Sequence, residues 1–401
     1  MHIHELLHKT FSNQLPQVHK TRLLSLMTAC EAAINSKQLY LTELGRSISN
    51  SNKECSNIQK VDRLLGNGHL QAERESFYQV MINLVLQENS YAWIHIDWTC
   101  LNSTTKRYVL RASVSMQGRS IVIYEECFSK KQENNHATHK AFLNRLKNLL
   151  PASVKPIIVT DAGFRAPWFA YILKLDWNFV GRLRNKNAIC LDDSSQWELS
   201  SKLFEQATSK PTHVGQGILT EEGKVPAHFI LYKGKPKGRA ALTKDKKKSS
   251  SGMSKRYAKA NKEPWVLVTS LSEAKTIPVL VVNIYRQRMR IEENIRDTKC
   301  SHYGLGLKNS LTKCSQRMNI LLLIAAICTL AAWLAGLYIK SVGKAADFQA
   351  HSAKFSALSY VYLGKRAIRK KLSITKEEFK SVLILLYQCA IKTQNEIHHY
   401  D

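Results

Sequence analysis

Two aspartates stand where an apolar, strand-like segment ends or is interrupted. Asp97 follows the apolar residues of "IHIDW", and Asp161 closes the run in "IIVTDAG". A carboxylate is unfavourable inside an apolar strand, so each aspartate needs a reason to be there. A single one usually has a structural explanation, which is to cap the helix that follows. Two on separate strands, together with Glu292 in a basic segment, favour a cluster of carboxylates.

Three clustered carboxylates repel one another unless cations neutralise them. Their oxygens are hard ligands of the kind that Mg²⁺ and Mn²⁺ prefer. Two such ions roughly 4 Å apart can activate a nucleophile and stabilise the leaving oxygen at a phosphate. Asp97, Asp161 and Glu292 are therefore the predicted catalytic residues and metal ligands. The predicted cofactor is a pair of Mg²⁺ ions, for which Mn²⁺ can substitute.

The segment "YRQRMRIEENIRDTK" around Glu292 contains neither proline nor glycine and is predicted to form one helix. At roughly 100° per residue, four of its side chains share an arc of about 60°, namely Tyr285, Arg288, Glu292 and Lys299. Met289 and Arg296 flank this face. A solvated surface helix is the alternative, because Glu292 can pair with the arginine on either side of it.

The elements around the two aspartates follow a recognisable order. Three strand-like runs come in close succession between residues 91 and 128, and they predict an antiparallel meander. A helix, a strand ending at Asp161, a second helix and a further strand come next. The order β-β-β-α-β-α-β predicts a mixed sheet with helices on its faces, and hence an α/β fold.

The chain as a whole is predicted to have four parts. Residues 1–85 read as helical, and two short amphipathic helices around "LYLTELGRSI" and "NIQKVDRLLGNGHL" suggest a helix-turn-helix-like module or a plain helical bundle. A β-rich segment, 185–265, is inserted between the parts of the core, 86–184 and 266–344, and helices are predicted for 345–401.

One apolar segment has the length of a membrane span. Residues Ile320–Ile339 contain no charge over twenty positions. It is the one segment of this kind in the chain, and it follows the predicted Glu292 helix closely, so a helix buried in a core is favoured. The prediction is therefore a protein that does not associate with a membrane.

Composition points to a polyanionic partner. Lys and Arg number 59 against 31 Asp and Glu, a formal charge of +28. Nucleic acid is the partner most consistent with this excess. The nine cysteines form no CxxC pair, which disfavours a zinc ribbon or a disulfide scaffold and favours a cytoplasmic protein with reduced thiols.

A second class of function is a metallopeptidase. "HELLH" from His4 to His8 matches the HExxH pattern, which places two zinc ligands and a general base on one helical face. No clear third ligand follows nearby, so this interpretation is disfavoured.

Taken together, the strand order, the Asp–Asp–Glu set and the inserted β-rich segment resemble a DDE transposase with a ribonuclease H-like core. The spacing Tyr, two residues, Arg, three residues, Glu, six residues, Lys is the signature of the insertion sequence four family, and Tyr285, Arg288, Glu292 and Lys299 fit it. Shorter matches are "LTELGR", "DRLLGN", "RASV", "TDAGF", "EPWVL" and "YGLGL". The resemblance covers nearly the whole chain.

The resemblance implies cut-and-paste transposition. Water attacks the phosphodiester at a transposon end, the freed 3′-hydroxyl forms a hairpin with the opposite strand, a second water opens it, and the 3′-hydroxyl then joins target DNA. The implied partners are double-stranded DNA, as inverted-repeat ends and as target, and a second copy of the chain in a homodimer on DNA. The N-terminal helices would bind the transposon ends.

By the same resemblance, Tyr285, Arg288, Lys299 and Arg296 are expected to contact DNA. Trp265 is the candidate to stack on a flipped base and Met289 the candidate wedge, although ordinary packing would also explain both. The remaining alternative is a catalytically inactive DNA-binding protein or repressor derived from a transposase.

Overall fold

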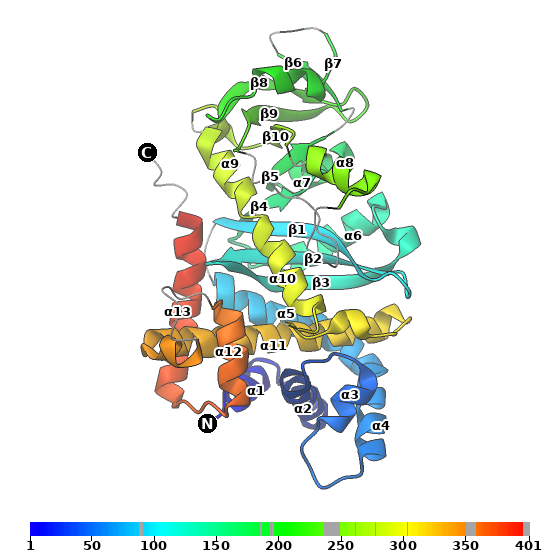
Figure 1. Cartoon of the computed structure of the whole chain (residues 1–401), viewed down its shortest axis with the longest axis vertical. Helices are drawn as coiled ribbons and strands as arrows, with labels where there is room; N and C mark the ends of the chain where they lie inside the picture. Colours follow the sequence, from blue (N-terminus) through cyan, green and yellow to red (C-terminus); the bar gives the residue numbers. More distant parts are fainter. Residues whose placement is uncertain are drawn as a thin grey trace. The chain divides into compact units, whose positions relative to one another are not determined.

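The computed structural model describes residues 1–87, 91–184, 187–192, 194, 196–235, 249–260, 262–276, 278–302, 304–349 and 358–395. The chain divides into two compact units (Figure 1). The first combines Met1–Pro156 with Arg288–Glu396, and the second contains Ile157–Gln287. The mixed α/β class predicted from the sequence is confirmed, because each unit combines β-strands with helices.

The first unit begins with helices and continues into a meander of strands. The N-terminal helices are α1 (Ile3–Gln14), α2 (Lys20–Ser36), α3 (Leu41–Arg46), α4 (Glu54–Leu65) and α5 (Gly68–Leu86). The strands are β1 (Tyr91–Asn102), β2 (Arg107–Met116) and β3 (Arg119–Ser129), followed by α6 (His136–Leu149). The antiparallel meander predicted from the sequence is confirmed, because β1 pairs with β2 and β2 with β3.

The long apolar helix lies at the centre of the first unit. It is α11 (Ser315–Ser341), the one helix among the described residues with the length and hydropathy of a membrane span, and its apolar stretch is wholly buried. It packs against β3 and against helices from both ends of the chain, including α12 (Tyr360–Arg369) and α13 (Lys376–Asn395) (Figure 1). The prediction of a core helix is confirmed, and the apolar run is explained by burial on all sides.

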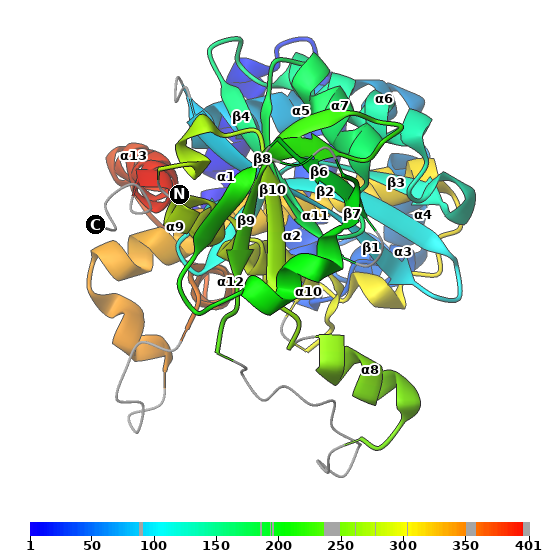
Figure 2. The ribbon, with the colours of Figure 1, turned by 90° about the horizontal axis from the view of Figure 1, so that it is seen from above.

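The second unit is built around a mixed sheet. Its strands are β4 (Lys155–Thr160), β5 (Asn178–Leu183), β6 (Ala188–Leu191), β7 (Glu198–Leu199), β8 (Thr212–Leu219), β9 (Val225–Tyr232) and β10 (Trp265–Thr269). Its helices are α7 (Ala166–Lys174), α8 (Gly252–Ala260) and α9 (Pro278–Arg286). Strands β4 and β5 are parallel, and the sheet continues antiparallel through β10, β9, β8, β6 and β7 (Figure 2). The strands of the predicted insertion thus extend the sheet that contains β5.

The prediction of one helix from Tyr285 to Lys299 is wrong. Helix α9 ends at Arg286, Gln287 and Arg288 form a turn, and α10 (Met289–Lys299) begins after it. The break coincides with the boundary between the two units. Each helix buries its apolar face in its own unit, and this packing overrides a local sequence that has no helix breaker.

Close packing of α11 on α12 depends on two glycines. A Cβ on Gly364 would overlap the carbonyl oxygen of Ala332, and one on Gly336 would overlap that of Tyr360. Two helices can approach this closely only where neither carries a side chain at the crossing.

We therefore expect Gly364→Ala to lower the free energy of unfolding by about 2–4 kcal/mol, because the helices must separate and lose buried contacts. Urea unfolding followed by circular dichroism measures the change. Gly68→Ala is the matched control, since a Cβ there meets no atom within 4 Å. An equally small effect at both positions would contradict the close crossing of α11 and α12.

Candidate active site

Asp97 lies in β1, where the strand passes from the buried core towards a more accessible edge. Residues 92–96 of the strand are buried, whereas those from Asp97 to Cys100 are partly exposed. Asp97 pairs in register with Arg111 of β2, and the side chain of Asp97 is 13 % exposed. The strand therefore holds this carboxylate rigidly, at the point where it can still meet a ligand.

Arg288 joins Asp97 to Glu292. Its Nη2 lies 2.6 Å from Glu292 Oε1, and its Nη1 lies 3.6 Å from Asp97 Oδ2. The first contact is an i,i+4 pair, whereas the second connects the start of α10 to β1. One guanidinium thus neutralises two carboxylates that come from distant parts of the sequence.

This arrangement fits a hard cation in its donor chemistry. The guanidinium supplies positive charge between two carboxylates, and a divalent ion bound by the same two carboxylates would do the same. Glu292 keeps 43 % of its side chain exposed, so it is accessible to a ligand. Within the described residues, however, no three His, Cys, Asp or Glu side chains gather into a group that could hold a metal.

Asp161, the third predicted carboxylate, belongs to the second unit. It follows β4 directly, at the carboxyl end of a strand that is parallel to β5. Its Oδ1 accepts a hydrogen bond of 2.8 Å from the backbone N–H of Gly163, which turns the chain towards α7. Asp161 thus has a local structural role and remains partly exposed.

Lys299, at the last turn of α10, reaches the same strand as Asp97. Its ammonium group donates a hydrogen bond to the carbonyl oxygen of Cys100 and lies 3.3 Å from Thr99 Oγ1. Burial lowers the pKa of Lys299 below its ordinary value. Arg288 and Lys299 therefore bring cations from the two ends of α10 to β1.

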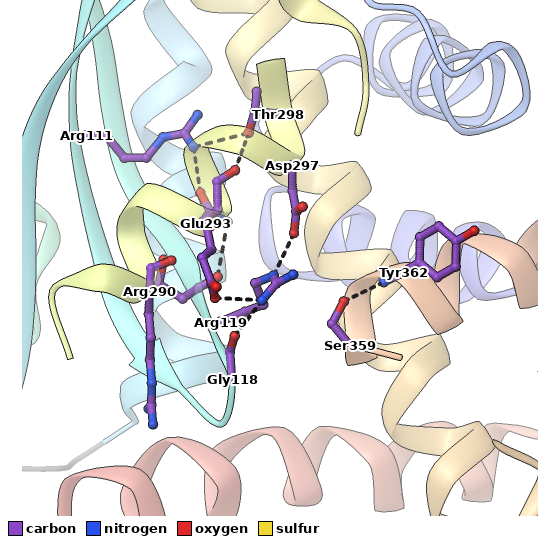
Figure 3. Close-up of polar contacts among 11 residues, drawn as sticks. Arg111, Gly118, Arg119, Arg290, Glu293, Asp297, Thr298, Ser359 and Tyr362 are labelled. Carbon is purple, nitrogen blue, oxygen red and sulfur yellow. Dashed lines mark hydrogen bonds and ion pairs between the residues drawn. The ribbon is translucent and has the colours of Figure 1, made fainter. Parts of the chain in front are cut away.

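Sequence reasoning missed Arg111, which holds α10 in place, and Glu125, the ion-pair partner of Arg111. Arg111 is 1 % exposed and forms an ion pair of 2.7 Å with Glu125, which is fully buried. The same guanidinium donates hydrogen bonds to Asn294 and Thr298 on α10 (Figure 3). The signal that singled out Asp97, a charge within an apolar strand, is also present in "YVLRASV" and "IVIYEECF".

Two of the predicted DNA-binding residues lie on the surface of α10. Met289 is 36 % exposed at the first helical position, and Arg296 is exposed in the last turn.

Two others lie in the second unit. Tyr285 is 5 % exposed and packs edge-on against Trp265 with 4.9 Å between ring centroids. Trp265 opens β10 and also contacts Tyr232, while the guanidinium of Arg182 lies 5.9 Å from its ring. Tyr285 lies on α9, so it does not belong to the same continuous helix as Glu292 and Lys299, which lie on α10.

Trp98, next to Asp97, packs on the other face of the meander. Its ring lies edge-on to Phe128, and its indole N–H donates a 2.9 Å hydrogen bond to His139 Nε2. Burial, reinforced by the charge of His136, lowers the pKa of His139 to about 4. The neutral imidazole is therefore the form that accepts this bond.

The lowered pKa predicts how stability depends on pH. The unfolded chain protonates His139 below about pH 6.5 and the folded chain only near pH 4, so its contribution is full above pH 6.5 and is lost as the pH falls towards 4. We expect His139→Gln, which retains an acceptor for Trp98, to lose less stability than wild type across this window, by up to about 3 kcal/mol. Urea titrations at both ends of the window measure the difference, and parallel curves for the two proteins would contradict it.

The double ion pair of Arg288 predicts competition with divalent ions. With Arg288→Gln, Mn²⁺ should bind the free protein about tenfold more tightly, because no guanidinium competes for the two carboxylates. Electron paramagnetic resonance of free Mn²⁺ measures the affinity. Arg296→Gln, on the same helix, is the control for lost positive charge, and Asp97→Asn added to Arg288→Gln should abolish the gain. Equal affinities in wild type and Arg288→Gln would show that the guanidinium does not occupy the cation position.

Comparison with known protein families finds one family model that covers the site. Residues 94–329 match the model of the transposase DDE domain, and this range contains Asp97, Asp161 and Glu292. No curated protein sequence matches the chain. The match covers more than half of the 401 residues and includes most of β1, the strands β2 and β3, the sheet of the second unit, α10 and part of α11. The chain therefore belongs to the DDE transposase family.

Proposed function

We propose that this protein is the transposase of a bacterial insertion sequence and that it moves its element by cut-and-paste transposition. The observation that carries the proposal is the convergence of Asp97 and Glu292 on Arg288 within the family-matched region. Within the family, the spacing from Tyr285 to Lys299 favours the insertion sequence four group, and the chain resembles the transposase of the Tn-ten transposon.

The proposed catalytic residues are Asp97, Asp161 and Glu292. Together they would hold two Mg²⁺ ions, and the chemistry that such ions supply is to activate an attacking oxygen and neutralise the leaving oxygen of a phosphodiester. Because end nicking, hairpin formation, hairpin opening and strand transfer are all displacements at phosphorus, one site can serve the whole sequence of steps. Carboxylates fixed on a strand and on a docked helix provide the rigid support that this reuse needs.

The proposed DNA contacts combine charge with aromatic surface. Arg288, Lys299 and Arg296 would bind backbone phosphates, with the planar guanidinium of Arg288 suited to a bidentate contact. Trp265 would stack on a flipped base, with Tyr285 supporting its ring and Met289 entering the duplex as a wedge. The formal charge of +28 supports an extended DNA footprint.

The proposed organisation keeps four parts and a dimer. Residues 1–85 would bind the transposon ends, and 86–184 with 266–344 would form the ribonuclease H-like catalytic core. Residues 185–265 would be an inserted β-rich domain, and 345–401 a helical C-terminal region. Cutting two ends in one event requires two active sites, which favours a homodimer on DNA. The predicted short helices of the N-terminal part correspond to α3 and α4, which pack against each other.

An end-cleavage assay tests the proposal. The substrate is a DNA that carries the inverted repeats flanking the gene, with Mg²⁺ present. Wild type and Glu293→Gln should nick the ends and form hairpins, whereas Glu292→Gln should bind the ends and cleave at least about 100-fold more slowly. Glu293 is a close control, because it is the neighbouring carboxylate on α10 and pairs with Arg119 instead.

Two outcomes would count against this assignment. Loss of end binding in Glu292→Gln, together with loss of cleavage, would make Glu292 a structural residue. Binding without cleavage by wild type would favour the alternative of a catalytically inactive DNA-binding protein or repressor.

A further inference from the structure

Arg111 occupies an unusual place in the meander. It lies opposite Asp97 of β1 and also opposite Glu125 of β3, so three charged residues stand side by side on adjacent strands. Directly opposed residues in a sheet point to the same face. Asp97, Arg111 and Glu125 therefore project towards the side of the meander that α10 covers, and α10 contacts all three strands (Figure 1).

The guanidinium of Arg111 connects this row of charges to α10. Its Nε donates to Glu125 Oε2 at 2.7 Å, and its Nη1 donates to Asn294 Oδ1 at 2.6 Å and to Thr298 Oγ1 at 3.1 Å. Asn294 and Thr298 are i,i+4 neighbours, so one planar group contacts two consecutive turns of the helix. This contact opposes both sliding and rotation of α10.

The two polar partners on α10 are themselves held in orientation. The amide of Asn294 donates to the carbonyl oxygen of Ser120 on β3 at 3.1 Å, which defines the side from which its oxygen accepts. The hydroxyl of Thr298 donates to the Asn294 carbonyl at 3.2 Å and thus presents a lone pair to Arg111. Glu292 lies two residues before Asn294, and Lys299 directly follows Thr298.

We propose that Arg111, neutralised by Glu125, is a positioning residue that sets the register of α10 so that Glu292 meets Asp97. This inference rests on the proposed function. A charge pair of this kind, fully buried, is a weak source of stability, because desolvation offsets most of its attraction. Its directional contacts to α10 are the feature that an apolar pair of equal volume would not reproduce.

A second connection to α10 supplies a matched control. Arg119 pairs with Glu293 at 2.6 Å and with Asp297 at 2.9 Å on another side of the helix (Figure 3). Arg119 is partly exposed and is not part of the row that contains Asp97. Loss of Arg119 removes two ion pairs to the same helix without changing the contacts of Arg111.

The test compares Arg111→Met/Glu125→Leu with Arg119→Met and with Arg111→Lys. The double variant removes both buried charges and leaves neither unpaired, so it should fold, as urea unfolding will show. End binding should stay within about threefold of wild type, whereas the rate of cleavage in a single turnover should fall at least about 100-fold. Mn²⁺ affinity of the free protein should fall about tenfold, because the two carboxylates no longer converge.

The controls separate positioning from general stability. Arg119→Met should alter the cleavage rate and the Mn²⁺ affinity less than about fivefold. Arg111→Lys should retain only part of the wild-type cleavage rate and Mn²⁺ affinity, because an ammonium lacks the planar fork of a guanidinium. A folded double variant with Mn²⁺ affinity and cleavage close to wild type would overturn the proposal. The Mn²⁺ titration needs no DNA, so it tests the positioning of α10 even if wild type fails to cleave, which would count against the proposed function instead.

Discussion

The docking of α10 on the three-stranded meander is the interaction on which the candidate site depends. This helix carries Glu292 and Lys299, and Arg288 directly precedes it, yet it offers few apolar residues to a core: Ile291 and Ile295 are buried, alongside the polar Asn294 and Thr298. Hydrogen bonds and ion pairs from β2 and β3 therefore replace much of the usual apolar contact. Polar contacts of this kind are directional, so they specify one register where an apolar face would tolerate several.

The rest of the first unit gives this docking a rigid base. The apolar helix α11 packs against β3, and Asn319 within it accepts a hydrogen bond from the backbone N–H of Cys127. Helices from both ends of the chain surround α11, and two glycines let α12 approach it at backbone distance. A well-packed core resists small displacements, and the strands that carry Asp97 and Arg111 gain that resistance.

Five carboxylates on α10 and on the strands beneath it each form an ion pair with a guanidinium. Arg288 serves Asp97 and Glu292, Arg111 serves Glu125, and Arg119 serves Glu293 and Asp297. Of these carboxylates, Glu125 is wholly buried, and burial raises its pKa while Arg111 opposes that rise. Glu292 is the more exposed member of the pair bound by Arg288, which suits a residue that must exchange one cationic partner for another.

Much of the local structure could be predicted because it depends on short-range pattern. The meander, the alternation of helices and strands up to β5, and the buried apolar helix all follow from hydrophobic periodicity and length. The candidate carboxylates could also be identified from the sequence, because burying an aspartate in an apolar strand costs free energy and therefore calls for an explanation. Arg111 and Glu125 are also charged residues within apolar strands, but the neighbouring sequence does not identify the partner that compensates a buried charge.

The sequence by itself determined which residues are chemically notable and which class of elements carries them, since side-chain type and period are properties of neighbouring residues. Only the tertiary structure decided that the chain turns at Gln287–Arg288, that Tyr285 packs on Trp265, and that Arg288 reaches Asp97. These outcomes depend on contacts between residues far apart in the chain. Such contacts are selected by the packing of a whole unit, and a periodicity read along one segment does not contain them.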